Sequence, residues 1–323
     1  MPKVELPPLV MQAATGYAAP ADDPGPFATV ALGDLGGLTQ FGVRIETLPP
    51  GSTSSMRHWH SAEDEFVWIL EGHLTLIEDT GETALGPGAA AAFPAGRRNG
   101  HCLVNRTRQP ATFLVAGWRD GEDVCTYSGR NRLCVKSGGI PRFTRRDGTP
   151  LAPEEETGSF EDPAPQGPGG VIDIAALPER TGASYPEPWG TMMNGRHIRR
   201  LGDAKGLTQF GASLVTIDPG GLSSLRHWHA REDEFVLMLE GRLTLIEDAG
   251  ETSLKPGDMT AHPAGVPNGH HMRNDTGLPA RFLVLGTCSP EETCDYPGVD
   301  LLAHTAGARA WYATRDGRVL KEL

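Results

Sequence analysis

The chain has no surplus of positive charge and no apolar run of membrane-spanning length. Its 323 residues include 29 Lys and Arg against 41 Asp and Glu, and the formal net charge is −12. Nucleic acids and anionic membranes attract proteins with a basic face, so this composition argues against both as partners. The lack of a long apolar run argues against a transmembrane helix.

Cysteines are also few, and the N-terminus lacks the apolar core of a secretory signal. The five cysteines are an odd number, and free thiols in a reducing cytoplasm are the simplest interpretation. Cys288 and Cys294 are close enough in sequence for a local bridge, although nothing in the sequence requires one. We therefore expect a cytoplasmic protein with reduced cysteines.

No long stretch has the period of a helix. Short apolar runs alternate with turn signals instead, and the chain is rich in glycine (41) and proline (27). The runs at residues 74–77, 113–115 and 282–285 have the length of strands. Many short strands at close spacing indicate an all-β sandwich or barrel.

The same sequence occurs twice, 169 residues apart. Arg-His-Trp-His is found at 57–60 and again at 226–229, and Leu-Thr-Gln-Phe-Gly at 38–42 and again at 207–211. A repeat of this length is too long for a solenoid unit, so each copy should be a domain in itself.

The repeat predicts four segments. They are an N-terminal arm at 1–26, a first domain at 27–148, a linker and arm at 149–195, and a second domain at 196–323. The third segment is rich in proline, glutamate and glycine, a composition that favours an extended linker. Its last part should be an arm that leads into the second domain.

Each copy holds three histidines and a carboxylate in an arrangement that suits a divalent metal. His58 and His60 are two residues apart, so on a strand both imidazoles face the same side. Glu65 opens the next strand, and His101 follows a Pro-Ala-Gly turn. The predicted metal ligands are His58, His60, Glu65 and His101 in the first copy and His227, His229, Glu234 and His270 in the second.

Two questions about these sites stay open. Glu63 and Glu232 are alternative carboxylate ligands, although a two-residue turn after His60 is a poor way to return to the ion. Three imidazoles and one carboxylate leave two open positions on a six-coordinate ion, for water, substrate or dioxygen. Such a ligand set accepts iron, manganese, nickel or zinc.

The residues around these ligands resemble the two sequence motifs of the cupin superfamily. The first copy matches them at Gly51, His58, His60, Glu65, Gly72, Gly88, Pro94, Gly96, His101 and Asn105. The second copy matches them at Gly220, His227, His229, Glu234, Gly241, Gly257, Pro263, Gly265, His270 and Asn274. One departure is the spacer of four residues between Gly96 and His101, which is longer than usual. The resemblance implies a bicupin, in which two double-stranded β-helix (jelly-roll) barrels stand in tandem and each domain holds one metal.

One apolar set in each copy should face away from the site. If Glu65 faces the ion, strand alternation turns Phe66, Trp68 and Leu70 outward, together with their counterparts Phe235, Leu237 and Leu239. A lone half would expose this face to water. We therefore expect the halves to pack as a pseudo-dimer, and a higher homo-oligomer stays open.

Differences between the copies predict different ligands for the two sites. Arg97 and Arg98 in the first copy become Val266 and Pro267 in the second, in a turn expected near the cavity mouth. Two arginines attract anions, so the first site should prefer carboxylate-bearing ligands and the second more neutral ones.

Other residues are weaker candidates for substrate contacts. Gln40 and Gln209 should line the cavities as hydrogen-bond donors. His262 is either a packing residue or a pocket residue. Arg57 and Arg226 either pair with a neighbouring acidic loop or anchor a substrate anion.

The predicted function is that of a metal-dependent enzyme acting on a small organic, carboxylate-bearing substrate. The chemistry is either that of a dioxygenase or that of a Lewis-acid lyase, isomerase or decarboxylase. The resemblance favours the dioxygenase, because the superfamily contains many of them. The alternative is a non-catalytic module that binds a small metabolite, with a metal that is structural or orients the ligand. The sequence singles out no catalytic residue beyond the metal ligands.

Overall fold

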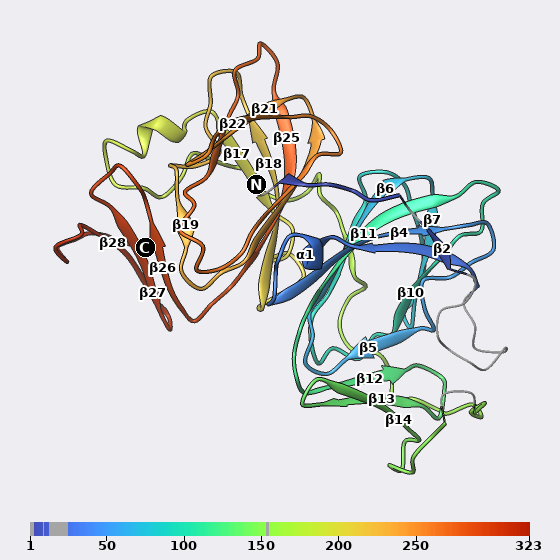
Figure 1. Cartoon of the computed structure of the whole chain (residues 1–323). Coiled ribbons are helices and arrows are strands. Elements are labelled where there is room, and N and C mark those ends of the chain that lie inside the picture. Colours follow the sequence, from blue (N-terminus) through green and yellow to red (C-terminus); the bar gives the residue numbers. More distant parts are fainter. Residues whose placement is uncertain (1–2, 9, 13–24, 153–154) are drawn as a thin grey trace.

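The computed structural model contains two jelly-roll barrels of antiparallel strands, one from each copy of the repeat (Figure 1). It describes residues 3–8, 10–12, 25–152 and 155–323. Most of the predicted arm at 1–26 therefore lies outside the described residues. Helical structure in the described part is limited to α1 (Leu32–Leu35) and the short 3-10 helix η2 (Thr191–Met193). No described helix has the length and apolar character needed to cross a membrane.

The first barrel consists of two seven-stranded sheets. One sheet has the order β15-β9-β6-β11-β4-β3-β2 and the other β14-β13-β12-β5-β10-β7-β8. The strands of the first sheet are β2 (Met11–Gln12), β3 (Phe27–Ala31), β4 (Phe41–Leu48), β6 (Glu65–Glu71), β9 (Ala90–Phe93), β11 (Ala111–Trp118) and β15 (Val171–Ile172). Those of the second are β5 (His58–His60), β7 (Leu74–Glu78), β8 (Gly81–Leu85), β10 (His101–Val104), β12 (Asp123–Tyr127), β13 (Leu133–Ser137) and β14 (Ile140–Thr144).

The second barrel repeats this arrangement. Its seven-stranded sheet has the order β1-β23-β20-β25-β18-β17-β16, and the remaining strands form the orders β19-β26-β27-β28-β29 and β22-β21-β24. The seven-stranded sheet contains β1 (Lys3–Val4), β16 (Arg180–Thr181), β17 (Arg196–Arg200), β18 (Phe210–Ile217), β20 (Glu234–Glu240), β23 (Met259–His262) and β25 (Ala280–Thr287). The other strands are β19 (Trp228–His229), β21 (Leu243–Glu247), β22 (Gly250–Leu254), β24 (His271–Arg273), β26 (Glu291–Asp295), β27 (Leu302–Ala306), β28 (Arg309–Ala313) and β29 (Val319–Glu322).

The motif glycines that follow β6 and β20 are required by the backbone. Gly72 has a φ of 73° and Gly241 a φ of 72°, in the left-handed region that side chains disfavour. A Cβ at Gly72 would also lie 2.7 Å from the Pro110 carbonyl oxygen, and one at Gly241 2.8 Å from that of Pro279. The turn that ends each of these strands therefore admits only glycine.

The two barrels exchange their leading strands. β1 precedes the first barrel but pairs with β23 of the second, where Lys3 lies opposite Thr260. β15 precedes the second barrel but pairs with β9 of the first, where Val171 lies opposite Ala91. Figure 1 shows the chain beginning beside the second barrel and then crossing to the first. The exchange ties the halves together through backbone hydrogen bonds.

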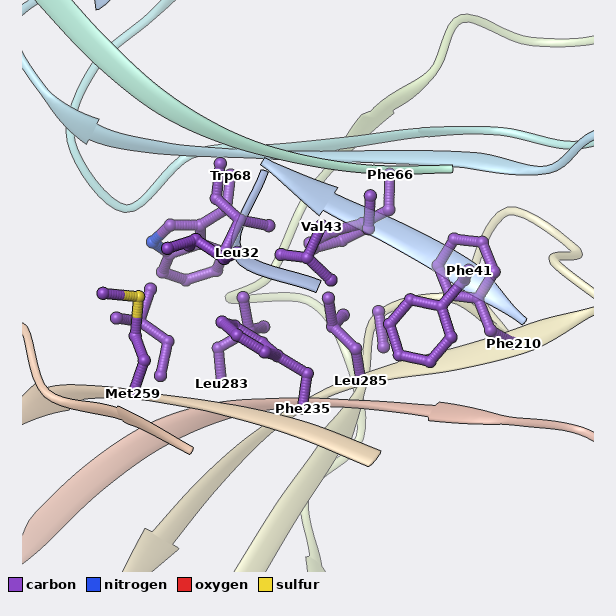
Figure 2. Close-up of a cluster of buried hydrophobic side chains, with 14 of the residues drawn as sticks. Leu32, Phe41, Val43, Phe66, Trp68, Phe210, Phe235, Met259, Leu283 and Leu285 are labelled. Atoms are coloured by element: carbon purple, nitrogen blue, oxygen red, sulfur yellow. The ribbon is translucent and has the colours of Figure 1, made fainter. Parts of the chain in front are cut away.

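A shared hydrophobic core lies between the sheet of the first barrel that contains β6 and the seven-stranded sheet of the second barrel. Figure 2 shows side chains of the first half, such as Phe66 and Trp68, facing side chains of the second, such as Phe235. Phe41 stacks on Phe210 with 5.7 Å between ring centroids. Leu70 and Leu239 are partly buried and pack against the same core. The outward apolar sets thus pack against each other, as strand alternation predicts.

One buried aspartate in each half, Asp64 or Asp233, accepts hydrogen bonds from the other half. Asp64 accepts hydrogen bonds from the backbone N–H groups of Thr208 and Gln209 in the second half, at 2.6 and 2.9 Å. It also accepts one from Ala95 N, at 2.7 Å, in its own Pro-Ala-Gly turn. Asp233 repeats all three contacts, with Thr39, Gln40 and Ala264 as donors. Each carboxylate is about 1% exposed, so these contacts are sheltered from water.

Candidate metal centres

The predicted ligands of the first half converge between the two sheets of the barrel. His58 and His60 lie on β5, and His58 pairs directly with His101 on the neighbouring β10. Glu65 opens β6 in the opposite sheet. In the second half, His227 pairs with His270 in an isolated bridge, His229 lies on β19 and Glu234 opens β20. The fold therefore brings together residues up to 43 positions apart in each copy, the span from His58 to His101 or from His227 to His270.

The distances within each cluster suit a single ion. In the first half, Glu65 Oε2 lies 3.3 Å from His101 Nε2 and 3.9 Å from His58 Nε2. In the second, Glu234 Oε1 lies 3.2 Å from His270 Nε2. Ligands at about 2.1 Å from a metal are separated by about 3.0 Å when adjacent and about 4.2 Å when opposite. The observed separations fall in this range, so the donor set fits a divalent transition metal.

Backbone contacts hold two imidazoles in the orientation that a metal requires. His58 Nδ1 donates to the Met56 carbonyl oxygen at 2.9 Å, and His227 Nδ1 donates to that of Leu225 at 2.9 Å. With the proton fixed on Nδ1, the lone pair of Nε2 points into the cluster. Burial lowers the pKa of both histidines to about 3. Both rings are therefore neutral at physiological pH and able to bind a metal.

The carboxylate of each cluster is ionised. Burial alone would raise the pKa of Glu65, but the adjacent His101, with further contributions from His58 and His60, lowers it to about 2. The pKa of Glu234 is lowered in the same way by His270 and His227. Each cluster thus combines imidazole nitrogens with one anionic oxygen.

A second carboxylate lies behind one further histidine of each cluster, His60 or His229, and sequence reasoning missed it. Asp123 Oδ2 lies 2.6 Å from His60 Nδ1, and Glu292 Oε1 lies 3.5 Å from His229 Nδ1. Despite burial, these carboxylates raise the pKa of His60 and of His229. Carboxylates behind a histidine ligand fix its ring and increase its basicity. The signal was present, because Asp123 and Glu292 are both acidic and 169 residues apart.

Glu63 and Glu232 lie behind the same histidines. Glu63 Oε2 is 3.8 Å from His60 Nδ1, the nitrogen that faces Asp123. It also forms an ion pair with Lys136 and accepts a hydrogen bond from Asp120 N. Glu232 is likewise 3.6 Å from His229 Nδ1. This placement favours Glu65 and Glu234 as the metal ligands.

The two carboxylates can be separated by experiment. Glu65→Gln should weaken metal binding to the first site by at least about 100-fold, because it removes the only anionic ligand, whereas loss of an outer carboxylate costs about 10–100-fold. Glu63→Gln is the matched control and should weaken binding by less than this, because Glu63 lies behind His60 at 3.8 Å and outside the cluster around Glu65. Metal titration of the two variants, each combined with His227→Ala to silence the second site, checks this. A Glu63→Gln protein that loses its metal while Glu65→Gln keeps it would reverse the assignment.

Two buried cysteines lie beside the clusters. The Cys125 sulfur lies within 4.8 Å of ligand atoms of His58 and His60, and Cys294 occupies the same place beside His227 and His229. Burial raises the pKa of both thiols, so they are protonated and poor ligands. All five cysteines of the chain are free.

Gln40 and Gln209 lie between the halves and outside the cavity linings. Gln40 Nε2 donates to the Arg231 carbonyl oxygen at 2.7 Å, and Gln209 Nε2 donates to that of Ala62 at 2.7 Å. Their side chains therefore complete the contacts that Asp64 and Asp233 make across the interface. The sequence alone could not show this, because the partner of each glutamine is in the other copy.

Arg97 and Arg98 also lie outside the first cavity. The Arg97 side chain lies against Gly167 of the linker and Gly206 of the second half. The Arg98 carbonyl oxygen accepts a hydrogen bond from Gln166 N at 2.7 Å. The linker runs over this turn, so the two arginines contact protein where the sequence suggested a cavity mouth.

His262 is a pocket residue. Its ring stacks on the predicted ligand His270, with 3.5 Å between centroids, as Phe93 stacks on His101 in the first half. His262 Nε2 lies 3.0 Å from Thr260 Oγ1. Burial lowers its pKa well below the ordinary value, so the ring is neutral.

Arg57 and Arg226 form ion pairs with the neighbouring acidic loops. Arg57 Nε lies 2.7 Å from Asp79 Oδ1, and Arg226 pairs with Asp248. These contacts support the salt-bridge alternative over a substrate anchor.

Each cluster opens into a cavity, and the two linings differ. The cavity of the first half has about 370 Å³ and that of the second about 430 Å³. Arg44 and Glu46 line the first, on β4. Tyr296 and Arg196 line the second. Both volumes suit a small organic ligand.

Glu46 should make stability depend on pH. Burial raises its pKa to about 7, partly opposed by Arg44. Because this exceeds the unfolded value of about 4.5, the folded protein binds the extra proton between pH 4.5 and 7, and its stability falls as pH rises through that window. In metal-free protein, the free energy of unfolding of Glu46→Gln should therefore exceed that of the parent by on the order of 2 kcal/mol at pH 8. The difference should be small at pH 4.

Urea unfolding at both pH values measures this difference, with Glu71→Gln at the exposed end of β6 as control. If the free energy of unfolding changes equally with pH in the parent and in Glu46→Gln, then Glu46 does not bind an extra proton in the folded protein.

Comparisons with known proteins agree with this geometry. The model of the Cupin domain family matches residues 44–117 and 213–286. A structure from Silicibacter pomeroyi DSS-3, described as a sugar phosphate isomerase from a cupin superfamily, is 45% identical. The match covers 46% of this chain and 96% of that one, with a TM-score of 0.45. No curated protein matches the chain.

Two further structures are similar over different extents. A candidate sugar phosphate isomerase from Acidithiobacillus ferrooxidans ATCC 23270 is 31% identical over 39% of this chain and 81% of its own, with a TM-score of 0.36. A candidate glyoxylate-induced protein from Pseudomonas aeruginosa is 17% identical over 88% of this chain and 83% of its own, with a TM-score of 0.51. The similarity to the Pseudomonas aeruginosa protein extends over both halves of the chain and concerns the fold alone.

Proposed function

Because the chain belongs to the cupin superfamily, we propose that it is a metal-dependent enzyme acting on a small organic anion. One divalent transition metal, iron, manganese, nickel or zinc, binds in each domain. The observation that carries the proposal is the convergence of ligand atoms inside both barrels. In each half, donor atoms of two histidines and a glutamate lie within 4.8 Å of one another.

The reaction we propose is an isomerisation of a small sugar phosphate. The relative that is 45% identical is described as a sugar phosphate isomerase, and this moves our proposal from the dioxygenase favoured by the sequence to Lewis-acid chemistry. When bound, the metal supplies polarisation of a carbonyl or hydroxyl oxygen. Interconversion of an aldose and a ketose transfers one proton between neighbouring carbons and one between their oxygens.

Each cavity holds a carboxyl group suited to carry such a proton. Glu46 in the first cavity has a pKa raised to about 7 by burial, and burial also raises the pKa of Glu232 in the second. General acids and bases work best when their pKa is near the working pH.

The proposal is tested by incubating the metal-loaded chain with pentose 5-phosphates and hexose 6-phosphates in D₂O. We expect conversion between aldose and ketose, followed by NMR, with deuterium entering at the carbon that receives the proton. The double variant His58→Ala, His227→Ala should lose this activity. Substrate-dependent oxygen uptake, or ligand retention without product, would contradict the proposal.

A further inference from the structure

A hollow rich in arginine opens beside the second metal centre. It has about 350 Å³. Its lining holds Arg180, Arg196 and Arg200, three serines and two tyrosines, and no carboxylate among the described residues. We name it the arginine hollow. Such an excess of positive charge, with no carboxylate in the lining, favours an anionic ligand.

The arginine hollow is continuous with the second metal cavity. The two spaces share six lining residues, Tyr185, Arg196, Arg200, Ser223, Ser224 and Tyr312. Ser224 Oγ lies 3.2 Å from His227 Nδ1, so the hollow begins at a predicted metal ligand. One molecule can therefore reach both the arginines and the metal centre.

Strand alternation on β17 separates side chains that pair with carboxylates on the outer face from arginines that line the hollow. His197 and Arg199 face outward, where they pair with Asp218 at 2.8 Å and Glu179 at 3.2 Å. Arg196 and Arg200 face inward with Ile198, which packs against the core of the barrel. The inward face thus presents its positive charge to the hollow.

The two inward arginines have spare hydrogen-bonding capacity. Arg196 Nη1 donates to the Gly182 carbonyl oxygen at 3.1 Å, and its Nε is buried without a hydrogen-bond partner. Arg200 lies 3.5 Å from Asp203, a contact at the protein surface. A buried guanidinium without a counter-ion is costly, so an anion in the hollow would stabilise this arrangement.

The first half lacks this feature. At the positions of Arg196 and Arg200, 169 residues earlier, it has Phe27 and Ala31. The first cavity is lined by Arg44, Arg119 and Lys136 together with Glu46, Glu63 and Glu65, so its positive and negative charges are equal in number. Arg97 and Arg98 are not in the lining of the first cavity, so we expect the second site, and not the first, to be the one that prefers anions.

We propose that the arginine hollow binds the phosphate group of a small phosphorylated polyol, whose hydroxyl or carbonyl end reaches the second metal centre. The phosphate part rests on the hollow alone, and the metal-bound end rests on the proposed function. A phosphomonoester carries a charge of about −1.5 to −2 and three acceptor oxygens, which matches two arginine forks and neighbouring hydroxyl groups. A carboxylate has one charge and two acceptor oxygens, so it engages fewer of these donors than a phosphate does.

The first test uses inorganic phosphate as the probe and the full chain freed of metal by dialysis against EDTA. Calorimetric titration should show one phosphate per chain. Arg196→Gln should weaken binding at least tenfold, and Arg196→Gln with Arg200→Gln at least 30-fold. Arg199→Gln, on the outer face of the same strand, is the matched control and should bind as the parent does. Unchanged phosphate affinity in the double variant would overturn the proposal.

Two controls keep the test decisive. Metal reloading to the parental level shows that each variant is folded; if Arg196→Gln fails this check, Arg196→Lys and Arg200→Gln replace it. In metal-loaded protein, a pentose 5-phosphate should bind at least tenfold more tightly than the free pentose or a three-carbon hydroxy acid. Equal binding of the hydroxy acid would assign the hollow to carboxylates and overturn the phosphate proposal.

Failure of this inference differs from failure of the proposed function. Phosphate binding that depends on Arg196 and Arg200, without any turnover, upholds the hollow and contradicts the enzyme. Turnover of sugar phosphates that is insensitive to both arginines upholds the enzyme and contradicts the hollow.

Discussion

His58→Ala is expected to empty the first metal site and leave the second filled, so that metal content falls from about two to about one per chain. The reason is that no residue is shared between the clusters around Glu65 and Glu234. Loss of a ligand should cost more than the about 10–100-fold in affinity that follows loss of an outer carboxylate. His227→Ala should do the reverse, and the double variant should hold no metal.

Elemental analysis of the purified variants measures this effect. His73→Ala is the control, because His73 is an exposed histidine in the turn between β6 and β7 and belongs to neither cluster. Loss of both metals from either single variant would show that the two sites are coupled. Retention of two metals in His58→Ala would show that His58 is not a ligand.

Asp64→Ala should lower the free energy of unfolding by about 3–5 kcal/mol. The substitution leaves three partly buried backbone N–H groups, those of Ala95, Thr208 and Gln209, without the buried acceptor that they share. Each hydrogen bond to a charged group contributes about 1.5–3 kcal/mol, and partial exposure of the donors reduces the sum. Two of these donors belong to the other half, so the loss should also loosen the packing of Phe41 on Phe210.

Urea unfolding compares Asp64→Ala with Asp34→Ala, in which the lost carboxylate is exposed and pairs with Arg119 at the surface. Surface pairs contribute little, so the control should unfold close to the parent. Asp233→Ala should behave like Asp64→Ala, since its contacts are the same. Equal stability of Asp64→Ala and Asp34→Ala would mean that the aspartates do not fasten the halves.

The fold was predictable from local signals. Short apolar runs bounded by glycine and proline gave the strands, and the alternation of Glu65 with Phe66 and Trp68 placed one face toward the site and the other toward the second half. The repeat supplied the division into two barrels. The proximity of His58 and His60 also followed, because both lie on one short strand.

Contacts between the copies were not predictable in the same way. Gln40 and Asp64 each have partners more than 140 positions away, in the other half. Likewise, the linker covers Arg97, and no local pattern marks which surface an extended segment will follow. The exchange of β1 and β15 has the same cause, since a strand of two residues carries almost no signal of its own.

Asp123 and the arginine hollow illustrate a signal that was present but unused. Comparison of the copies at the fixed offset pairs Asp123 with Glu292, and Phe27 and Ala31 with Arg196 and Arg200. The first comparison shows that both copies have a carboxylate behind a predicted histidine ligand. The second marks a difference in charge that becomes meaningful only when β17 is known to face the cavity.

The central claim is that each half holds one divalent metal at its histidine and glutamate cluster. The most direct measurement is the metal content of the native chain, purified without chelator from metal-replete cells, by mass spectrometry of the elements. The account predicts about two equivalents of a first-row transition metal per chain. A content near zero would contradict it.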